Sequence, residues 1–584
     1  MSQLPLLGQP QRDRVWPYAV YLAIAVWFTW PIYAVPQGLG IMDWDQHFFF
    51  YASVLKSVRA FWQLPFWNPW YCGGNVLWQN PQVAVLSPVY PLTLVMTLPM
   101  AMKVTITAHF FASFVGMHLL VTRVFRLTFF PVVLFIASLY TLAGAHVLHI
   151  GVGHTTFLPF LYLPLALFFT CRAFETGAIR HAVPAGAVMA FGVWNGGIYA
   201  AAMGGLSIAG LAAVLSVLER RWRPILVVAV MGASLGLFAA PKIVPVAMAL
   251  GSPHFQDLRE ISKGDSITWG EAVHALSNPE RPAGFVGWFE YGNYIGVFGS
   301  LIVAACLWFV LMKAWRKERA LAVSLALVAV ALLFLLRGDF GPHAPFTMLR
   351  ALPVFSTFRS PGRYTIVFAL VAAAMVAAAI RLALEGGDVP RGLRQLLGIL
   401  LLAAVYDQAS HNRPILVGVL GQGPLDPKAP VLARAGAPML DVDNPSTGPD
   451  SPMIRSLAEN RDLMRCYETL HPDLKAVPSK DIVWSPDPNV KVFSSAFSPN
   501  RIEFTVLTGA ADARVYLNQN YIEGWRSSAG AVAFDPGVGL GYVTLPRAFA
   551  GRVTFSFRPP GLFAGVALFA LGLVLSRWLW RRTF

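Results

Sequence analysis

Charged residues are scarce in this sequence. Only 13% of its 584 residues are Asp, Glu, Lys or Arg, whereas 56% are hydrophobic. Soluble domains carry about 25% charged residues, so a water-soluble globular protein is excluded for lack of polar surface. Lipid must serve as part of the solvent. The composition therefore predicts a membrane protein.

Cysteines are also few. The four of them, Cys72, Cys171, Cys306 and Cys466, lack the spacing of metal ligands. This excludes a cysteine-based zinc or iron–sulfur site. Cys72 and Cys466 both fall in segments that we predict on the same side of the membrane, so one disulfide between them stays open.

Acidic residues are fewer than basic residues. The chain has 45 Lys and Arg against 30 Asp and Glu, a formal net charge of +15. In a soluble protein this excess would indicate a nucleic-acid partner. Here the basic residues gather in short segments between apolar runs, which indicates membrane topology instead. We expect no nucleic acid.

Twelve apolar runs are long enough to span a bilayer. They fall near 17–35, 104–122, 128–146, 155–171, 183–201, 203–219, 224–247, 293–312, 319–336, 364–381, 395–408 and 561–576. A further apolar stretch, 83–102, contains Pro88, Pro91 and Pro99. Because proline breaks helices, this stretch is predicted to lie along the membrane surface or to re-enter it.

The basic residues fix the predicted orientation. If the N-terminus is cytoplasmic and 83–102 is not a span, every predicted inside segment is basic. Counting 83–102 as a span would place the later basic clusters outside. The chain is thus predicted to be a multi-pass membrane protein with both termini cytoplasmic.

The predicted organisation has three parts. Residues 1–408 form a transmembrane module with a long first outside loop, 36–103. Residues 409–560 alternate apolar and polar side chains, as in Arg501–Leu507, and predict a β-rich domain outside the membrane. Residues 561–584 form the last transmembrane helix and a basic cytoplasmic tail.

The first outside loop opens with two carboxylates. Asp43 and Asp45 are followed by Gln46 and His47. Charged groups near a membrane tend to be functional. One Asp can act as general base, and an Asp-x-Asp pair can bind a divalent cation. The alternative is that these residues cap a helix and face water.

The same loop is rich in aromatic residues. Trp67, Asn68, Trp70 and Tyr71 stand close together. These aromatics can face a sugar or a lipid, and the alternative is anchoring at the membrane interface. In the next outside turn His154 follows Gly153, where it can donate a hydrogen bond to an anionic group.

Two later outside loops add charged residues. Glu290 and Tyr291 precede the span at 293–312, where Glu290 is either a functional carboxylate or an acid favoured by the helix dipole. Arg359 and Arg363 stand on the outside, against the positive-inside trend. Guanidinium groups bind phosphate bidentately, so we expect these two to hold a phosphate; the alternative is a salt bridge to an outside acid.

These features, in this order, resemble the YfhO-like family of bacterial membrane proteins, which belongs with the GT-C glycosyltransferases. The resemblance rests on an ordered series of motifs. They are the Asp43 loop, Trp67-Asn68-Pro69, Gly73-Gly74, Asn80-Pro81-Gln82, Ser87-Pro88, Gly153-His154, Tyr294-Ile295-Gly296, Phe358-Arg359-x-Pro361-x-Arg363, Tyr521-x-x-Gly524-Trp525 and Phe557-x-Pro559-x-x-Leu562. The series is weakest across 200–285 and 415–500.

The resemblance implies a GT-C fold and a transferase activity. Such enzymes take a sugar from a polyprenyl-phosphate carrier and pass it to a cell-envelope glycan, polymer, lipid or protein. It implies Asp43 or Asp45 as the catalytic residue, and a phosphate bound by Arg359, Arg363 and His154. Substrate binding is expected from Glu290, Tyr291, Asn68, Gln46 and His47. No cofactor is required, although Asp43 and Asp45 can hold Mg or Mn.

Two other functions fit the same pattern less well. A transporter or flippase of lipid-linked glycans would place ionisable residues at the bilayer midplane, where this sequence has almost none. A non-catalytic assembly factor for envelope polymers would tolerate substitution of Asp43.

Overall fold

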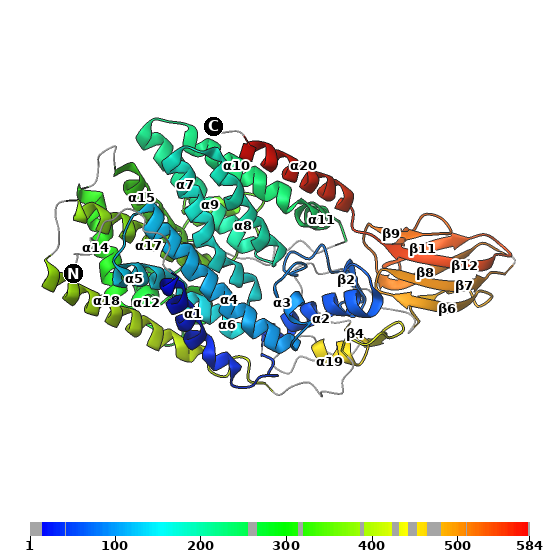
Figure 1. The fold of residues 1–584 in the computed structure, drawn as a ribbon. Helices are drawn as coiled ribbons and strands as arrows, with labels where there is room; N and C mark the ends of the chain where they lie inside the picture. Colours follow the sequence, from blue (N-terminus) through cyan, green and yellow to red (C-terminus); the bar gives the residue numbers. More distant parts are fainter. Residues whose placement is uncertain are drawn as a thin grey trace.

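The computed structural model describes residues 15–40, 42–254, 265–313, 319–385, 390–422, 431–441, 453–463, 481–509 and 511–581. Figure 1 shows a helical bundle with a β-rich region at one end. The last helix, α20 (Leu562–Arg581), leads from this region back along the bundle.

Helices occupy all twelve predicted apolar ranges. Their bounds are α1 Trp16–Thr29, α4 Leu98–Leu119, α5 Phe130–Thr141 with α6 Gly144–Val152, α7 Leu163–Thr176, α8 Ala182–Trp194, α9 Ile198–Glu219, α10 Arg223–Phe238 with α11 Ala240–Leu250, α14 Val297–Lys313, α15 Ala320–Arg337, α17 Tyr364–Leu384, α18 Arg391–Asn412 and α20. The 83–102 stretch holds the four-residue helix α3 (Val89–Leu92) and the start of α4, and forms no spanning helix of its own.

Seven helices in the described residues are long and apolar enough to cross a membrane, or eight if α10 and α11, bent by 80°, form one broken span. The chain is a multi-pass membrane protein. Of the other predicted spans, α14 has 17 residues, α1 has 14 and α8 has 13. Helix α18 is long enough but carries Arg391, Arg394 and Asp407. The count of twelve stays a prediction.

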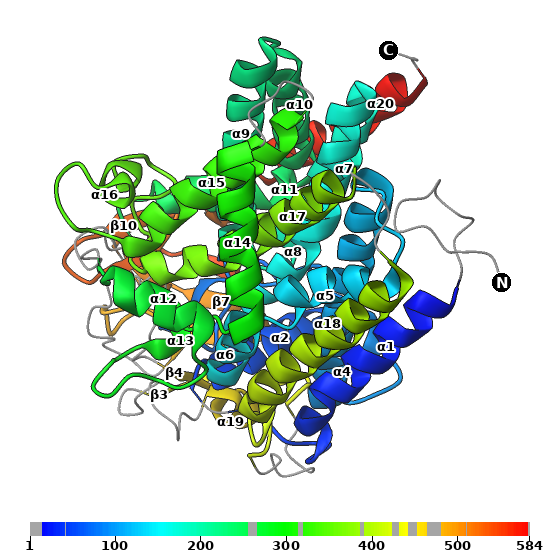
Figure 2. The ribbon, with the colours of Figure 1, turned by 90° about the vertical axis from the view of Figure 1, so that its left-hand side faces the viewer.

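Helix α17 lies at the centre of the bundle. Every residue from Tyr364 to Ala379 is buried, and a helix that is apolar on all sides must be surrounded by others. It packs against α15, α14 and α5, and Figure 2 shows it among these helices and α18. Its two ends therefore mark the two faces of the bundle.

The β-rich region contains two antiparallel four-stranded sheets. One has the order β10 (Ala533–Asp535), β11 (Leu540–Leu545), β8 (Ala513–Asn520), β5 (Val483–Trp484), and the other β6 (Lys491–Ser498), β7 (Arg501–Leu507), β12 (Ala550–Phe557), β9 (Trp525–Ser527). In β7 the side chains of Ile502, Phe504 and Val506 alternate into the core. The predicted β-rich character is confirmed.

The segment predicted as the first outside loop contains regular secondary structure. It contains the 19-residue helix α2 (Asp43–Phe61) and a hairpin of β1 (Trp67–Asn68) and β2 (Asn75–Val76). The prediction that its aromatics face a sugar, a lipid or the membrane interface is wrong for Trp67, Trp70 and Tyr71, which are almost completely buried.

These aromatics are buried because the C-terminal region covers them. The Trp67 indole N–H donates to Oε1 of Gln519 at 2.8 Å, and the Cys72 N–H donates to the carbonyl of Leu463 at 2.7 Å. Cys72 is disulfide-bonded, whereas Cys171 and Cys306 are free. Cys466, the partner that the sequence suggested, lies outside the described residues.

Candidate functional site

Asp43 is the first residue of α2 and contacts His154, which follows the end of α6. Its Oδ2 lies 3.1 Å from Nε2 of His154. The neighbouring Trp44 indole N–H donates to the carbonyl of Ile150 at 2.7 Å and so holds the start of α2 against the end of α6. The sequence predicted both residues of the pair, but not that they touch.

Gly153 makes this approach feasible. It ends α6 with φ +94°, and a Cβ there would lie 2.2 Å from the backbone nitrogen of Trp44. A side chain is therefore excluded both by the left-handed backbone and by the contact with α2. The Gly153-His154 dipeptide places the imidazole on Asp43 because its first residue is a glycine.

His154 has a second imidazole behind it. Its Nδ1 lies 2.8 Å from Nδ1 of His149, so one of the two nitrogens carries the proton that is shared between them. Nε2 of His149 is buried and has no partner in the described residues. Asp43, His154 and His149 thus form a linear hydrogen-bonded chain that runs inward from the more exposed carboxylate.

Glu290 and Arg363 form a second pair. Glu290 lies in α13 (Trp288–Tyr291), and Arg363 ends the 3₁₀ turn Pro361–Arg363. The Arg363 Nε donates to Oε2 and its Nη2 to Oε1, both at 2.6 Å. The two side chains are only 9% and 11% exposed. The arrangement is the salt bridge that the sequence left open as an alternative to phosphate binding by Arg363.

The two pairs meet at one aromatic ring. Phe157 stacks on His149 with centroids 3.8 Å apart and on His154 at 5.5 Å. The guanidinium of Arg363 lies 5.1 Å from the centroid of the same ring. The predicted residues Asp43, His154, Glu290 and Arg363 therefore belong to one cluster. Nothing in the sequence distinguishes Phe157 from the other apolar residues of its predicted span.

The charges of the cluster shift the pKa values of its two carboxyl groups. Burial alone would raise the pKa of Asp43, but the hydrogen bond and charge of His154 outweigh it and hold this pKa below its ordinary value. Burial likewise opposes ionisation of Glu290, and Arg363 lowers its pKa well below the usual range. Both carboxylates are therefore anionic at neutral pH.

His47 lies one helical turn after Asp43. It is buried, and this burial lowers its pKa to about 4 although the charge of Asp43 opposes the shift. His47 is therefore neutral at pH 7, so it lies near Asp43 without offsetting the negative charge of the Asp43 carboxylate.

Asp45 points to a different partner. Its carboxylate accepts the backbone N–H groups of Met453 at 3.1 Å and Ile454 at 3.4 Å, at the start of the short helix α19 (Met453–Ala458). It thus helps to attach the C-terminal region to α2. Within the described parts of the chain no group of three or more His, Cys, Asp or Glu side chains could hold a metal ion.

Other predicted residues lie in separate contacts. Asn68 is buried in the hairpin, where its Oδ1 accepts the Trp70 N–H. Gln46 donates to the Tyr71 hydroxyl at 3.3 Å, and the Tyr291 hydroxyl donates to Asp265 at 2.6 Å. None of these contacts reaches the aromatic ring that joins the two pairs.

Arg359, four residues before Arg363, is exposed. The adjacent Phe358 packs on Tyr199 with centroids 5.1 Å apart, and Tyr199 in turn lies under the Arg363 guanidinium at 4.8 Å. Because Glu290 already accepts from Nε and Nη2 of the buried Arg363, Arg359 is the more accessible of the two arginines predicted to bind phosphate.

Comparisons with solved structures define the class of fold. The arabinofuranosyltransferase AftD from Mycobacteria superposes with a TM-score of 0.51 at 15% identity, covering 95% of this chain and 40% of that one. The chain therefore shares the fold of AftD over the aligned region, and it spans less than half the length of AftD.

A more distant likeness is found to the oligosaccharyltransferase of Archaeoglobus fulgidus. Its apo form gives a TM-score of 0.43 at 12% identity and covers 71% of this chain and 57% of that one. The archaeal enzyme AglB, solved with an inhibitory peptide and a dolichol-phosphate, gives 0.41 at 10% identity, covering 71% and 56%. No family profile and no curated protein sequence matches the chain.

Proposed function

We propose that this protein transfers a sugar from a polyprenyl-phosphate carrier to a cell-envelope glycan, polymer, lipid or protein. The observation that carries the proposal is the pairing of Asp43 with His154 at 3.1 Å beside the buried Glu290–Arg363 pair, within a membrane fold shared with an arabinofuranosyltransferase. The YfhO-like resemblance of the ordered motifs supports the same class.

In the proposed reaction Asp43 is the general base. It takes the proton of the acceptor hydroxyl while that oxygen forms a bond to the anomeric carbon of the sugar. The bond from this carbon to the carrier phosphate breaks, and polyprenyl phosphate leaves with the electron pair. Attack opposite the leaving group inverts the anomeric centre. His154 holds the Asp43 carboxylate ionised and oriented.

The leaving phosphate needs a positive partner. Arg359 is exposed and can bind the phosphate directly. Arg363 keeps the site electrically balanced against Glu290 and fixes the aromatic wall. A metal ion is not required by this scheme, because a guanidinium can neutralise a monophosphate leaving group.

The proposal includes the topology that the sequence predicted. All twelve predicted ranges would span the membrane or complete a broken span, with the site on the outer face of a bacterial cytoplasmic membrane and both termini inside. Residues 409–560 would form the outer domain. The contacts of Asp45 and Lys56 in α2 with residues 453–457 support a role of this domain in positioning the acceptor.

The test is transfer of radiolabelled sugar from a panel of polyprenyl-phosphate pentoses and hexoses in membrane vesicles. We expect Asp43→Asn to reduce transfer by about 100-fold or more. Asp339→Asn is the matched control, because Asp339 accepts a hydrogen bond from Thr347 and lies outside the cluster. Wild-type transfer activity in Asp43→Asn would exclude Asp43 from the mechanism. Absence of transfer by the wild-type protein, relative to vesicles that lack it, would favour an assembly factor.

A further inference from the structure

A cavity of about 250 Å³ lies among the ends of α4, α7, α9, α15 and α17. Its charged lining residues are Glu175, Glu219, Arg319, Arg381 and Glu385. Its wall also contains Leu215 and Leu382. No step of the proposed transfer uses any of these groups.

The cavity lies at the opposite end of the bundle from Asp43. Arg363 directly precedes α17, and Arg381 lies near the C-terminal end of this helix. At 1.5 Å per residue the two arginines are separated by about 27 Å along the helix axis, close to the thickness of a bilayer core. The cavity therefore opens near the other membrane surface.

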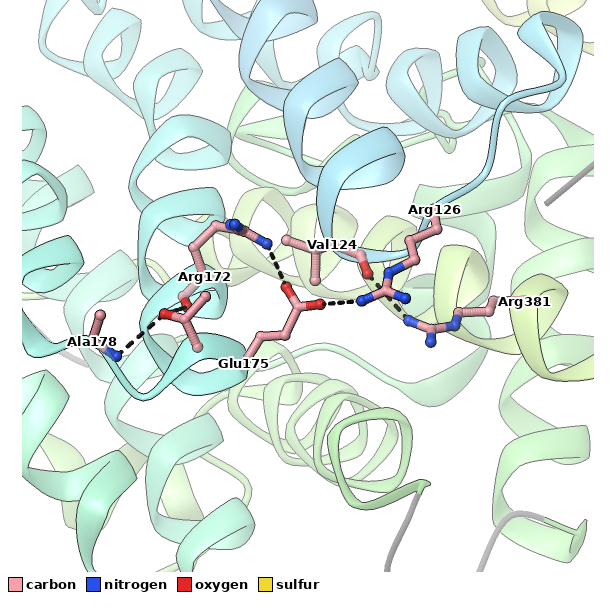
Figure 3. Close-up of polar contacts among 7 residues, drawn as sticks. Val124, Arg126, Arg172, Glu175, Ala178 and Arg381 are labelled. Atoms are coloured by element: carbon pink, nitrogen blue, oxygen red, sulfur yellow. Dashed lines mark hydrogen bonds and ion pairs between the residues drawn. The ribbon is translucent and has the colours of Figure 1, made fainter. Parts of the chain in front are cut away.

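One acid beside the cavity is fully neutralised. In Figure 3 Glu175 lies between Arg126 and Arg172, with N–O distances of 3.0 and 2.8 Å. Among the described residues, Arg381 donates only to the carbonyl of Val124, at 3.2 Å. A backbone carbonyl does not neutralise a guanidinium, so the Arg381 charge remains available to a ligand.

The remaining charges are of both signs. Arg319 lies 3.9 Å from Glu385, at the outer limit of an ion pair. Glu219 lines the same cavity and has no hydrogen bond or ion pair within the described part of the chain. A ligand that satisfies these groups must carry both an anionic and a cationic centre. A simple anion would leave Glu219 without a partner.

We propose that this cavity binds the head group of an amine-bearing phospholipid, such as phosphatidylethanolamine. The phosphate would lie between Arg319 and Arg381, and the ammonium would face Glu219. The glycerol and the first acyl carbons would contact Leu215 and Leu382. Pockets between helices at a membrane surface are suited to lipid head groups, because the acyl chains stay in the bilayer.

The test is native mass spectrometry of the full-length protein with added phosphatidylethanolamine, and with phosphatidylglycerol as the amine-free comparison. The wild-type protein should retain phosphatidylethanolamine about tenfold more strongly. Arg381→Gln should weaken retention of both lipids by about tenfold, through loss of a charge-assisted hydrogen bond. Glu219→Gln should abolish the preference for the amine and leave phosphatidylglycerol unchanged.

Arg221→Gln is the matched control, because Arg221 is exposed just beyond α9 and does not line the cavity. It should behave as the wild-type protein. Thermal melting of each variant shows that it is folded. Equal retention of the two lipids by the wild-type protein would overturn the proposal, as would unchanged retention in Arg381→Gln. Displacement of the lipid by inorganic phosphate would also overturn it, in favour of a soluble phosphate ligand.

Discussion

The two ends of the bundle use similar charged groups in different ways. At one end Glu290 and Arg363 are about 10% exposed and locked in a bidentate pair against an aromatic wall. At the other end Glu175 and Arg172 are about 30% exposed beside an open cavity. Desolvated pairs hold one geometry, whereas exposed pairs are screened and exchange partners. The end with Glu290 and Arg363 is therefore suited to catalysis, and the end with Glu175 and Arg172 to reversible ligand binding.

Breaking one pair at each end should give unequal losses of stability. Glu290→Gln leaves the buried Arg363 guanidinium without its counter-ion and should lower the free energy of unfolding by about 3–5 kcal/mol. Glu175→Gln removes a partly exposed partner and should cost less than about 1 kcal/mol. Thermal unfolding in detergent measures both. Equal losses at the two ends would contradict the difference between them.

The glycine that brings α6 onto α2 can be tested in the same way. Gly153→Ala should destabilise the fold by about 1–3 kcal/mol and reduce transfer, because its Cβ would meet the backbone of Trp44. Gly151→Ala is the control, since its Cβ would meet only Ile415 at 3.7 Å. If both variants keep wild-type activity and melting temperature, the Asp43–His154 contact does not depend on this close approach.

A buried carboxyl that has no cation beside it among the described residues sharpens the comparison. Asp462 in β4 (Arg461–Leu463) is fully buried; it accepts the Gly73 N–H at 3.1 Å. Burial raises its pKa to about 8, although hydrogen bonds from Gly73 and Gln519 oppose the shift. Glu290 is buried too, but Arg363 lowers its pKa. The sign of the shift thus follows the presence of a cation.

The raised pKa of Asp462 predicts a pH dependence of stability. Between the unfolded value of about 4 and the folded value of about 8, the folded state holds a proton that the unfolded state releases. Stability should therefore fall as pH rises through this window, by roughly 1 kcal/mol per pH unit. Asp462→Asn should flatten the melting temperature between pH 5 and 8, within roughly this window. Asp487→Asn, on a nearby loop, should keep the wild-type slope.

The smallest expected effect concerns the pH profile of transfer. His154 lowers the pKa of Asp43, so His154→Gln should move the acid limb of activity to higher pH. A purely structural role of His154 would reduce the rate at all pH values without moving this limb. Rates measured across the acid range distinguish the two results.

The sequence predicted some levels of this structure better than others. Long apolar runs predicted helices at twelve places, and a helix lies at each of them, because a bilayer demands such runs. Helix α2 was missed because its face is covered by residues some 400 positions away, as in the Lys56 contact with the carbonyl of Leu457. Local periodicity cannot report a partner at that distance.

The site was predicted at the level of residues and not of contacts. Asp43, His154, Glu290 and Arg363 stood out as polar groups in predicted outside segments. That Arg363 binds Glu290, 73 residues away, and that Asp45 caps α19 depends on the packing of the loops. The role of His149 was also missed, because its spacing from His154 suggested no helix-face pair.

The proposed function depends on Asp43 acting as the general base of sugar transfer. The most direct measurement is an electron cryomicroscopy structure of the full chain in lipid nanodiscs with undecaprenyl phosphate, the proposed leaving group. We expect the phosphate to contact Arg359 and to leave room for a sugar between it and Asp43. A phosphate bound more than about 15 Å from Asp43, far beyond hydrogen-bond reach, would contradict the account.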